Sequence, residues 1–259
     1  HSKGGGHSPP EKPYGIGLTR LGDGHELIWH RSDLYFEGTH FVDEQHAYCF
    51  DKNDFVVLDL ASGEMVKRIR LRNSGSIIEF DEALDRYKSP LDVSSKESKR
   101  LLTHRTNIGV GKYHFFMGGR VGVLGRIDIE TGEVCYLQVP VQVVLNDGKR
   151  EYSWNDFESG DDTGSGFSVE GDKRRLSHGF GHISAATPIV INDHIYFSTV
   201  LGTVYVVDAT ADRFDEQALV SVNDLGLPGE TWTLSPFSAS SGHLYQRTSR
   251  ELICIGNDQ

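Results

Sequence analysis

The fold is decided by the stretch HISAATPIVINDHIYFSTVLGTVYVVDA, from His182 to Ala209. β-Branched and aromatic side chains dominate three runs in it, which are Thr187 to Ile191, His194 to Thr199 and Thr203 to Asp208. Asn192-Asp193 and a segment containing Gly202 separate these runs, and such residues adopt the backbone conformations of tight turns. The stretch therefore predicts an antiparallel meander. One meander cannot bury its own faces, so the fold depends on whether the pattern recurs.

The pattern does recur, and its second copy has a fourth strand. The runs of that copy are Thr39 to Asp43, His46 to Phe50, Phe55 to Leu60 and Met65 to Leu71. The turn Asp59-Leu-Ala-Ser62-Gly63-Glu64 joins the last two runs, and Asp128-Ile-Glu-Thr131-Gly132-Glu133 repeats it. The aspartate can accept hydrogen bonds from nearby backbone, and the glycine accepts the positive φ of a tight turn. The repeating unit is therefore predicted to be a four-stranded antiparallel sheet.

These units predict an all-β fold, a β-propeller of four-stranded antiparallel blades. Residues 1–13 are rich in Gly, Pro and Ser and are expected to be a flexible segment. Residues 14–259 are expected to form a single propeller domain or the C-terminal part of a longer one. The predicted blades are residues 14–30 (partial), 36–71, 101–143, 182–222 and 231–256, the last with three strands.

Two long insertions between the blades account for the wide spacing of the repeats. The first, Arg72 to Lys99, is polar, and the spacing of apolar residues from Ile77 to Tyr87 predicts a short helix inside it. The second, Asn146 to Ser177, is rich in Gly, Asp and Ser. Surface loops can lengthen at little thermodynamic cost, so both insertions are compatible with the repeat.

Composition argues against several classes of partner. The formal net charge is −11, which disfavours binding to nucleic acid. No run approaches the roughly 18 consecutive apolar residues that a membrane span requires. The cysteines Cys49, Cys135 and Cys254 lie singly in strand-like runs and are expected to be small buried hydrophobic residues.

The repeat resembles that of the quinoprotein-like β-propellers. The residues that carry the resemblance are Thr187 to Ala209, the Ser/Thr-Gly-Glu turns, and the ending Leu244 to Gly256. This group, with its PQQ-like repeats, includes the BamB-like outer-membrane assembly factors and the pyrroloquinoline-quinone-dependent alcohol dehydrogenases. The resemblance implies a propeller of about seven or eight blades and a bacterial, extracytoplasmic location, either periplasmic or secreted. It does not assign an activity, because function resides in sites rather than in folds.

The sequence departs from the quinone-dependent members of this group. Those enzymes carry an adjacent pair of cysteines near the cofactor and a repeated docking tryptophan, and this chain has no adjacent cysteines. Trp29 closes a fourth strand, as a docking tryptophan does. The matching stretches after Glu64 and Glu133 offer Val66 and Tyr136 instead. No cofactor is therefore assigned, and pyrroloquinoline quinone with Ca²⁺ stays an alternative that only the resemblance implies.

One mouth of the predicted propeller is the first candidate site. His40, His104 and His182 fall at or just before the first strands of three blades, and Trp232 holds a similar position in the last unit. First strands line the central channel, so these residues and Arg105 are expected to surround one mouth. Imidazole and guanidinium groups there can bind an anionic or sugar-like ligand, and imidazoles alone can bind a transition metal. The alternative is a structural role, in which each histidine side chain forms a hydrogen bond with the backbone of a neighbouring blade.

A second candidate is the acidic loop around Asp156, Glu158, Asp161 and Asp162. Carboxylate oxygens are the ligands that Ca²⁺ prefers, but their spacing does not match an EF-hand loop, and a solvated loop is the favoured interpretation. The His178-to-His182 pair lacks the helix and glutamate of a zinc protease motif.

The sequence favours a non-catalytic binding or scaffolding propeller that recognises a protein, peptide or glycan at one mouth. The basis is the lack of a complete catalytic or cofactor motif together with long loops, which commonly carry recognition. The alternative is a quinone- or metal-dependent oxidoreductase of the PQQ-propeller type. A third hypothesis is that the protein is an enzyme that acts on polysaccharide.

Overall fold

The computed structural model describes residues 2–3, 15–22, 24–34, 40–51, 54–71, 73–93, 106–118, 122–154, 186–226, 231, 233–248 and 251–256. These residues form strands, turns and connecting segments and include no helix. No membrane-crossing helix therefore occurs in this part of the chain.

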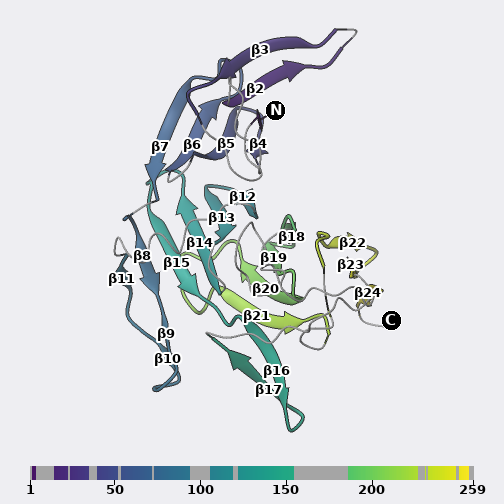
Figure 1. The fold of residues 1–259 in the computed structure, drawn as a ribbon. Coiled ribbons are helices and arrows are strands. Elements are labelled where there is room, and N and C mark those ends of the chain that lie inside the picture. The colour runs from purple at the N-terminus through teal and green to yellow at the C-terminus, as the bar shows by residue number, and fades with distance from the viewer. Residues whose placement is uncertain are drawn as a thin grey trace, which may run out of the picture.

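The strands form successive antiparallel meanders, which we call blades 1 to 5 (Figure 1). Blades 2 and 4 have four strands, blades 1 and 5 have three, and blade 3 has four strands of its own plus two from an insertion. Blade 1 is β1 (Ser2–Lys3), β2 (Gly15–Arg20) and β3 (Glu26–Arg31), and blade 2 is β4 (Phe41–Val42), β5 (His46–Asp51), β6 (Asp54–Asp59) and β7 (Met65–Arg70). Blade 3 is β12 (Asn107–Val110), β13 (Tyr113–Met117), β14 (Val123–Asp128) and β15 (Val134–Gln138). Blade 4 is β18 (Ile189–Ile191), β19 (His194–Ser198), β20 (Thr203–Asp208) and β21 (Leu219–Asp224), and blade 5 is β22 (Ser238–Ser240), β23 (His243–Arg247) and β24 (Leu252–Ile255).

This arrangement confirms the prediction of an all-β fold with four-stranded antiparallel blades of the propeller type. In Figure 1 the blades follow one another from blade 1 at the top to blade 5 at the right. Among the described residues, no sheet joins blade 5 to blade 1, so closure of a ring is not detected.

The turn between the third and fourth strands forms as its sequence predicts. In blade 2, Asp59 Oδ1 accepts hydrogen bonds from the Ser62 backbone N–H at 2.8 Å and from its hydroxyl at 2.7 Å. Gly63 follows with φ of +73°, a conformation that costs a residue with a Cβ. In blade 3, Asp128 Oδ1 accepts the Thr131 N–H at 2.8 Å. The repeated motif therefore encodes a repeated local structure.

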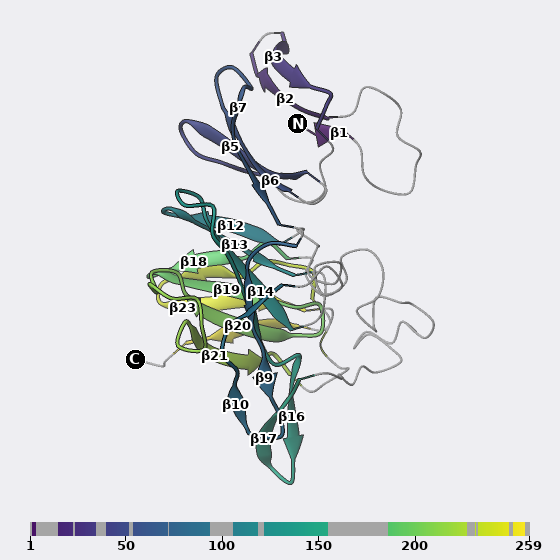
Figure 2. The same cartoon turned by 90° about the vertical axis from the view of Figure 1, so that its left-hand side faces the viewer.

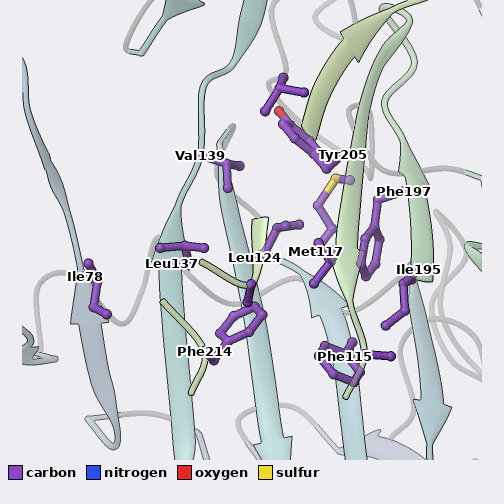
Figure 3. Packing of buried hydrophobic residues seen from close by; sticks show 14 of the residues in the cluster. Ile78, Phe115, Met117, Leu124, Leu137, Val139, Ile195, Phe197, Tyr205 and Phe214 are labelled. Carbon is purple, nitrogen blue, oxygen red and sulfur yellow. The ribbon is translucent and has the colours of Figure 1, made fainter. Parts of the chain in front are cut away.

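Each blade packs on the next through its own apolar cluster. Between blades 3 and 4 the cluster contains Phe115, Leu124, Phe197 and Tyr205 on facing strands (Figure 3). Separate clusters lie between blades 1 and 2, blades 2 and 3, and blades 4 and 5. Alternate residues of one strand serve different clusters, since Tyr205 faces blade 3 and Val206 faces blade 5. Strands with both faces covered read as continuous apolar runs, which is how the third strands appear in the sequence.

A donor from one blade also bonds to the Asp-containing turn of the next. Trp29 Nε1 donates to the Leu60 carbonyl at 2.8 Å, and Lys67 Nζ donates to the equivalent Ile129 carbonyl at 2.7 Å. Arg126 of blade 3 donates to the Ala211 carbonyl at 2.6 Å. These contacts hold the outer parts of adjacent blades together and confirm that Trp29 docks on its neighbour. Lys67, rather than Val66, takes the matching position in blade 2, because Lys67 is opposite Val57 just as Trp29 is opposite Leu18, beside the same register shift.

The first insertion forms strands, so the predicted helix from Ile77 to Tyr87 is wrong. It contains β8 (Ser76–Ile78), β9 (Phe80–Asp81), β10 (Arg86–Tyr87) and β11 (Leu91–Asp92). Strand β8 pairs in parallel with β15, and β11 pairs with β8, which extends the sheet of blade 3 to six strands. Asp81 Oδ1 accepts the N–H groups of Ala83 and Leu84 and forms a turn where the helix was expected. A distant strand thus supplies backbone partners that local spacing does not reveal.

The cysteines are free and differ in exposure. Cys49 is buried and matches the prediction, Cys135 is half-buried, and Cys254 is exposed, so the prediction of burial is wrong for Cys254. The reason is that Cys254 lies on β24, the edge strand of blade 5. A hairpin of β16 (Gln142–Asn146) and β17 (Lys149–Ser153) begins before the predicted start of the second insertion at Asn146 and projects from the bottom of the molecule (Figure 2).

Candidate binding face

The first strands of the blades begin at one end of the molecule, which we call the first-strand face. In blade 3, the Met117 N–H donates to the Thr106 carbonyl at 3.0 Å, and the Val139 N–H donates to the Gly122 carbonyl at 2.8 Å. The first strand therefore begins where the second and fourth strands end. This geometry follows from the antiparallel meander and gives each blade one loop and two chain connections at this face.

Hydrogen bonds join neighbouring blades along this face. The Thr203 hydroxyl of blade 4 donates to the Val141 carbonyl at 3.1 Å, beside a bond from the Tyr205 hydroxyl to the Pro140 carbonyl at 2.7 Å. The Thr233 N–H, just before blade 5, donates to the Val200 carbonyl of blade 4 at 2.9 Å. Hydrogen bonds between buried residues therefore join the ends of blades 3, 4 and 5.

Gln246 is the centre of a buried polar group in blade 5. It is fully buried, and its Nε2 donates to Thr233 Oγ1 at 2.7 Å and to the Ser235 carbonyl at 2.6 Å. The Thr233 hydroxyl in turn donates to the Arg247 carbonyl at 2.7 Å. Within the described residues, Gln246 Oε1 has no hydrogen-bond partner. A buried acceptor without a partner is costly, so this group departs from a fully satisfied core.

Buried polar side chains gather at this face in the blades. Burying a hydroxyl or amide is tolerated when it is hydrogen-bonded, and such bonded groups fix the position of the segments they join. The segments fixed here are the loops and connections of the first-strand face, so the arrangement is a rigid polar support for them. The buried members are Thr106, Ser198, Thr199, Thr203, Thr231, Thr233, Gln246 and Thr248.

Blade 2 contributes His40 and a carboxylate–guanidinium cluster to the first-strand face. His40 directly precedes β4 and is half-buried, and this burial is the main cause that lowers its pKa below the usual value. The histidine is therefore held mainly as neutral imidazole at pH 7. Arg68 Nη1 donates to Asp51 Oδ2 at 3.0 Å and to Asp54 Oδ2 at 2.8 Å, where β5 turns into β6.

The other predicted mouth residues lie outside the described residues, and so do the four carboxylates of the acidic loop. His104 and Arg105 directly precede Thr106, His182 lies four positions before Ala186, and Trp232 stands between Thr231 and Thr233. Thr106, Ala186, Thr231 and Thr233 are all buried. The acidic residues outside the description are Asp156, Glu158, Asp161 and Asp162. The shared mouth of His40, His104, Arg105, His182 and Trp232 therefore stays a prediction.

Sequence reasoning missed the threonine and glutamine layer. Its visible signal was Ser/Thr beside the second-to-third-strand loops, as in Ser198-Thr199…Thr203 and in Thr248. These residues read as ordinary strand residues in a β-rich repeat, because threonine has high strand propensity. Their role depends on carbonyls of the neighbouring blade, which one repeat does not contain.

The opposite end of the blades carries a different set of histidines. His46, His194 and His243 each begin the second strand of a blade. His194 Nδ1 lies 2.7 Å from the Asn192 carbonyl, and His243 Nδ1 lies 2.9 Å from the Ser241 carbonyl. A carbonyl can only accept, so these contacts place the proton on Nδ1. The described residues contain no group of three or more His, Cys, Asp or Glu side chains that could hold a metal ion.

Comparisons with known proteins find similarity in structure only. No family model matches the chain, and no curated protein matches it. Among solved structures, BamB from Moraxella catarrhalis shares 11% identity at a TM-score of 0.41, over 89% of this chain and 62% of that chain. Hsv2 from Kluyveromyces marxianus shares 9% identity at a TM-score of 0.43, over 90% and 53%. The Pan2 WD40 domain of Neurospora crassa shares 9% identity at a TM-score of 0.40, over 92% and 52%.

The chain thus spans between half and two thirds of the length of these three structures. Their TM-scores below 0.5 assign no function to it. The assignment of the propeller-type fold stands on the sheets and blade interfaces described above.

Proposed function

We propose that the protein is a non-catalytic binding module that holds a protein, peptide or glycan at the first-strand face. The observation that carries the proposal is the layer of buried, hydrogen-bonded Thr and Gln side chains that spans blades 3 to 5 at this face. A layer of this kind preorganises the loops above it, and preorganised loops lower the entropic cost of binding.

The predicted ligand contacts fit this location. In the sequence, His104 and Arg105 directly precede Thr106, and Trp232 lies between Thr231 and Thr233, which are members of this layer. His182 lies four positions before the buried Ala186, and His40 lies at the same end of blade 2. Imidazole, guanidinium and indole groups together offer charged hydrogen bonds and an apolar stacking surface, which suit a peptide carboxylate or a sugar ring. An extracytoplasmic location is part of the proposal and rests on the sequence resemblance alone.

Binding should be tested with the full chain against a displayed peptide library and a defined glycan array. The expected result is a selected ligand whose affinity falls at least tenfold in the His104→Ala/His182→Ala double variant. His194→Ala/His243→Ala is the matched control, because it removes two histidines from the opposite end of the blades. Equal losses in both double variants, or no loss in either, would contradict a site at the first-strand face.

A separate experiment tests the oxidoreductase alternative. The full chain is mixed with pyrroloquinoline quinone and Ca²⁺, dialysed, and examined by absorbance and native mass spectrometry. The binding-module proposal predicts no retained quinone. Stoichiometric quinone that survives dialysis would overturn it.

A further inference from the structure

His114 is a titratable side chain inside the contact between blades 2 and 3. It lies on β13 of blade 3 and is 1% exposed. Its ring centroid lies 4.6 Å from that of Phe55 and 5.6 Å from that of Phe50. The ring centroids of Phe41 and Tyr48 lie 6.2 Å away. Four aromatic rings of blade 2 therefore contact one imidazole of blade 3.

The repeat does not require a histidine at this position. The first residue of each second strand pairs with the aspartate that ends the third strand, and this pairing aligns blades 2, 3 and 4. The next residue is Ala47 in blade 2, His114 in blade 3 and Ile195 in blade 4. Ala47 and Ile195 are buried members of apolar clusters between blades. Because histidine changes its charge between about pH 5 and 8, blade 3 has a property here that an apolar residue cannot give.

A hydrogen bond fixes the imidazole of His114. Its Nε2 lies 3.0 Å from Asn107 Oδ1, and an amide oxygen can only accept, so Nε2 carries a proton in this contact. Asn107 is itself buried and begins β12, the first strand of blade 3. A further proton would have to bind Nδ1 and would convert the ring to an imidazolium inside the interface.

The carboxylates that the described part of blade 2 places on this face are bonded to other groups. Asp43 Oδ2 accepts the Tyr48 hydroxyl at 2.6 Å, and its Oδ1 accepts two backbone N–H groups. Asp59, which is opposite His46, accepts the N–H and the hydroxyl of Ser62. The facing sides of the two blades also carry the titratable side chains of His46, Tyr48, Lys67 and Tyr136.

Burial opposes proton uptake by His114 in the closed interface. Aromatic rings attract a cation through their faces, but a buried charge costs several times more free energy than a cation–π contact returns. In water, an imidazole takes up a proton near about pH 6.5. The opened chain therefore binds a proton at His114 more readily than the closed chain does. By linkage, the closed form is favoured above this pH, and acid favours the open form.

We propose that His114 makes the contact between blades 2 and 3 an acid-sensitive latch, which is closed at neutral pH and opens when His114 takes up a proton. Protonation of a buried histidine is a known way of changing an interface in mild acid. Opening also releases the bond to Asn107, which holds the start of β12. The inference does not depend on the binding function proposed above.

Thiol labelling of an introduced cysteine tests the latch in the full chain. Ile127→Cys reports on this interface, because Ile127 is fully buried and directly opposite His114. Val207→Cys is the matched control, because Val207 is equally buried and opposite Ile195 in the contact between blades 3 and 4. A pyridyl disulfide serves as the reagent, and peptide mass spectrometry measures labelling at each position. Rates are divided by those of the urea-unfolded chain at the same pH.

The expected result is an acid-dependent increase at one interface. One proton that only the open form binds raises the opening constant by up to about tenfold per pH unit below about pH 6.5. Labelling of Ile127→Cys should therefore rise at least about tenfold from about pH 7 to about pH 5, and that of Val207→Cys by less than about threefold. Adding His114→Gln to Ile127→Cys should remove the increase, because glutamine keeps a donor for Asn107 but takes up no proton.

An NMR titration of the unchanged chain gives a second measurement. The imidazole signal of His114, assigned by its loss in His114→Gln, should not titrate near about pH 6.5 while the chain is folded. This measurement decides the question if a variant does not fold, which circular dichroism at neutral pH would show.

Four results would overturn the inference. These are no acid-dependent increase in the labelling of Ile127→Cys, an equal increase in Val207→Cys, an increase that persists with His114→Gln, and an ordinary titration of His114 in the folded chain.

Discussion

Replacing Arg126 with methionine should strongly destabilise the contact between blades 3 and 4. The guanidinium is buried and donates to the carbonyls of Ala211 at 2.6 Å and Asp212 at 3.1 Å. It also lies 4.2 Å from the centroid of the Tyr113 ring and 5.4 Å from that of the Phe214 ring. Methionine keeps most of the apolar stem but loses the donors and the charge.

The expected loss follows from these contacts. A hydrogen bond from a charged donor contributes about 1.5 to 3 kcal/mol. A desolvated cation–π contact contributes about 1 to 2 kcal/mol. The recovered hydration of the arginine in the unfolded chain offsets part of the sum, and Asp212 is exposed enough for water to reach its carbonyl. We therefore expect a net loss of about 2 to 4 kcal/mol. For a chain of this size, that loss lowers Tm by roughly 4 to 16 °C.

Urea denaturation followed by tryptophan fluorescence measures this loss. The matched control is Arg20→Met, because Arg20 is exposed and forms a surface ion pair with the exposed Glu26 at 2.9 Å. Exposed pairs contribute about 0 to 1 kcal/mol. Arg126→Lys should recover part of the stability, because it keeps the charge but not the two-pronged geometry. If Arg126→Met lost no more stability than Arg20→Met, the proposed role of Arg126 in joining the blades would be refuted.

The remaining predictions concern four other positions. Gly63→Ala should lower the free energy of unfolding by about 2 to 4 kcal/mol, because Gly63 has φ of +73° and the added Cβ would lie 2.5 Å from Trp29 Cδ2. The same substitution in a Trp29→Ala background should lower it by less, as measured by denaturation. Phe197→Ala should lower the free energy of unfolding by about 3 to 5 kcal/mol in the same assay, because Phe197 is buried between blades 3 and 4. The control Val190→Ala, at an exposed position, should lower it by less than about 1 kcal/mol. Hydrogen bonds from the Thr210 side chain and backbone lower the pKa of Asp208. The ionised carboxylate therefore stabilises the fold above pH 3.8, and this stabilisation is lost as the pH falls through the folded-state pKa. Denaturation of Asp208→Asn should show a stability that depends less on pH in that range. Burial lowers the pKa of His40, so the folded protein binds a proton there less readily than the unfolded chain does. The free energy of unfolding should therefore fall as the pH drops below 6.5. If His40→Gln showed the same pH dependence, this explanation would be wrong.

Local signals were sufficient for the repeating part of the fold. The Asp59-to-Glu64 turn could be predicted because its bonds join residues only a few positions apart, from Asp59 to Ser62. The alternation of Tyr205 and Val206 between two clusters could not be assigned from one blade, although the continuous apolar run of β20 indicated that both faces are covered. The turn motif and the strand-forming residues therefore predict the blade itself. Which blade covers each face of a strand depends on packing between blades and could not be predicted from one repeat.

Contacts between distant segments explain what sequence reasoning missed. The spacing of Ile77 to Tyr87 suited a helix, but Ile77 pairs in parallel with Tyr136 of β15, and this long-range pairing decides its conformation. At the first-strand face, the Thr203 hydroxyl reaches the Val141 carbonyl of another blade. Of the predicted mouth residues only His40 lies in the described part of the chain, so the histidine ring itself stays a prediction.

Strands β20 and β24 show that an apolar strand sequence specifies partners as well as a conformation. Both strands align on the same blade positions, and both carry apolar residues that suit burial. In β20 a second strand, a fourth strand and two neighbouring blades cover those residues, whereas in β24 the open edge and outer face leave Leu252 exposed. Exposed apolar residues on an unpaired edge promote association with other chains. The same pattern of apolar residues is buried in β20 and exposed in β24, so the elements around a strand, and not its own residues, decide its burial.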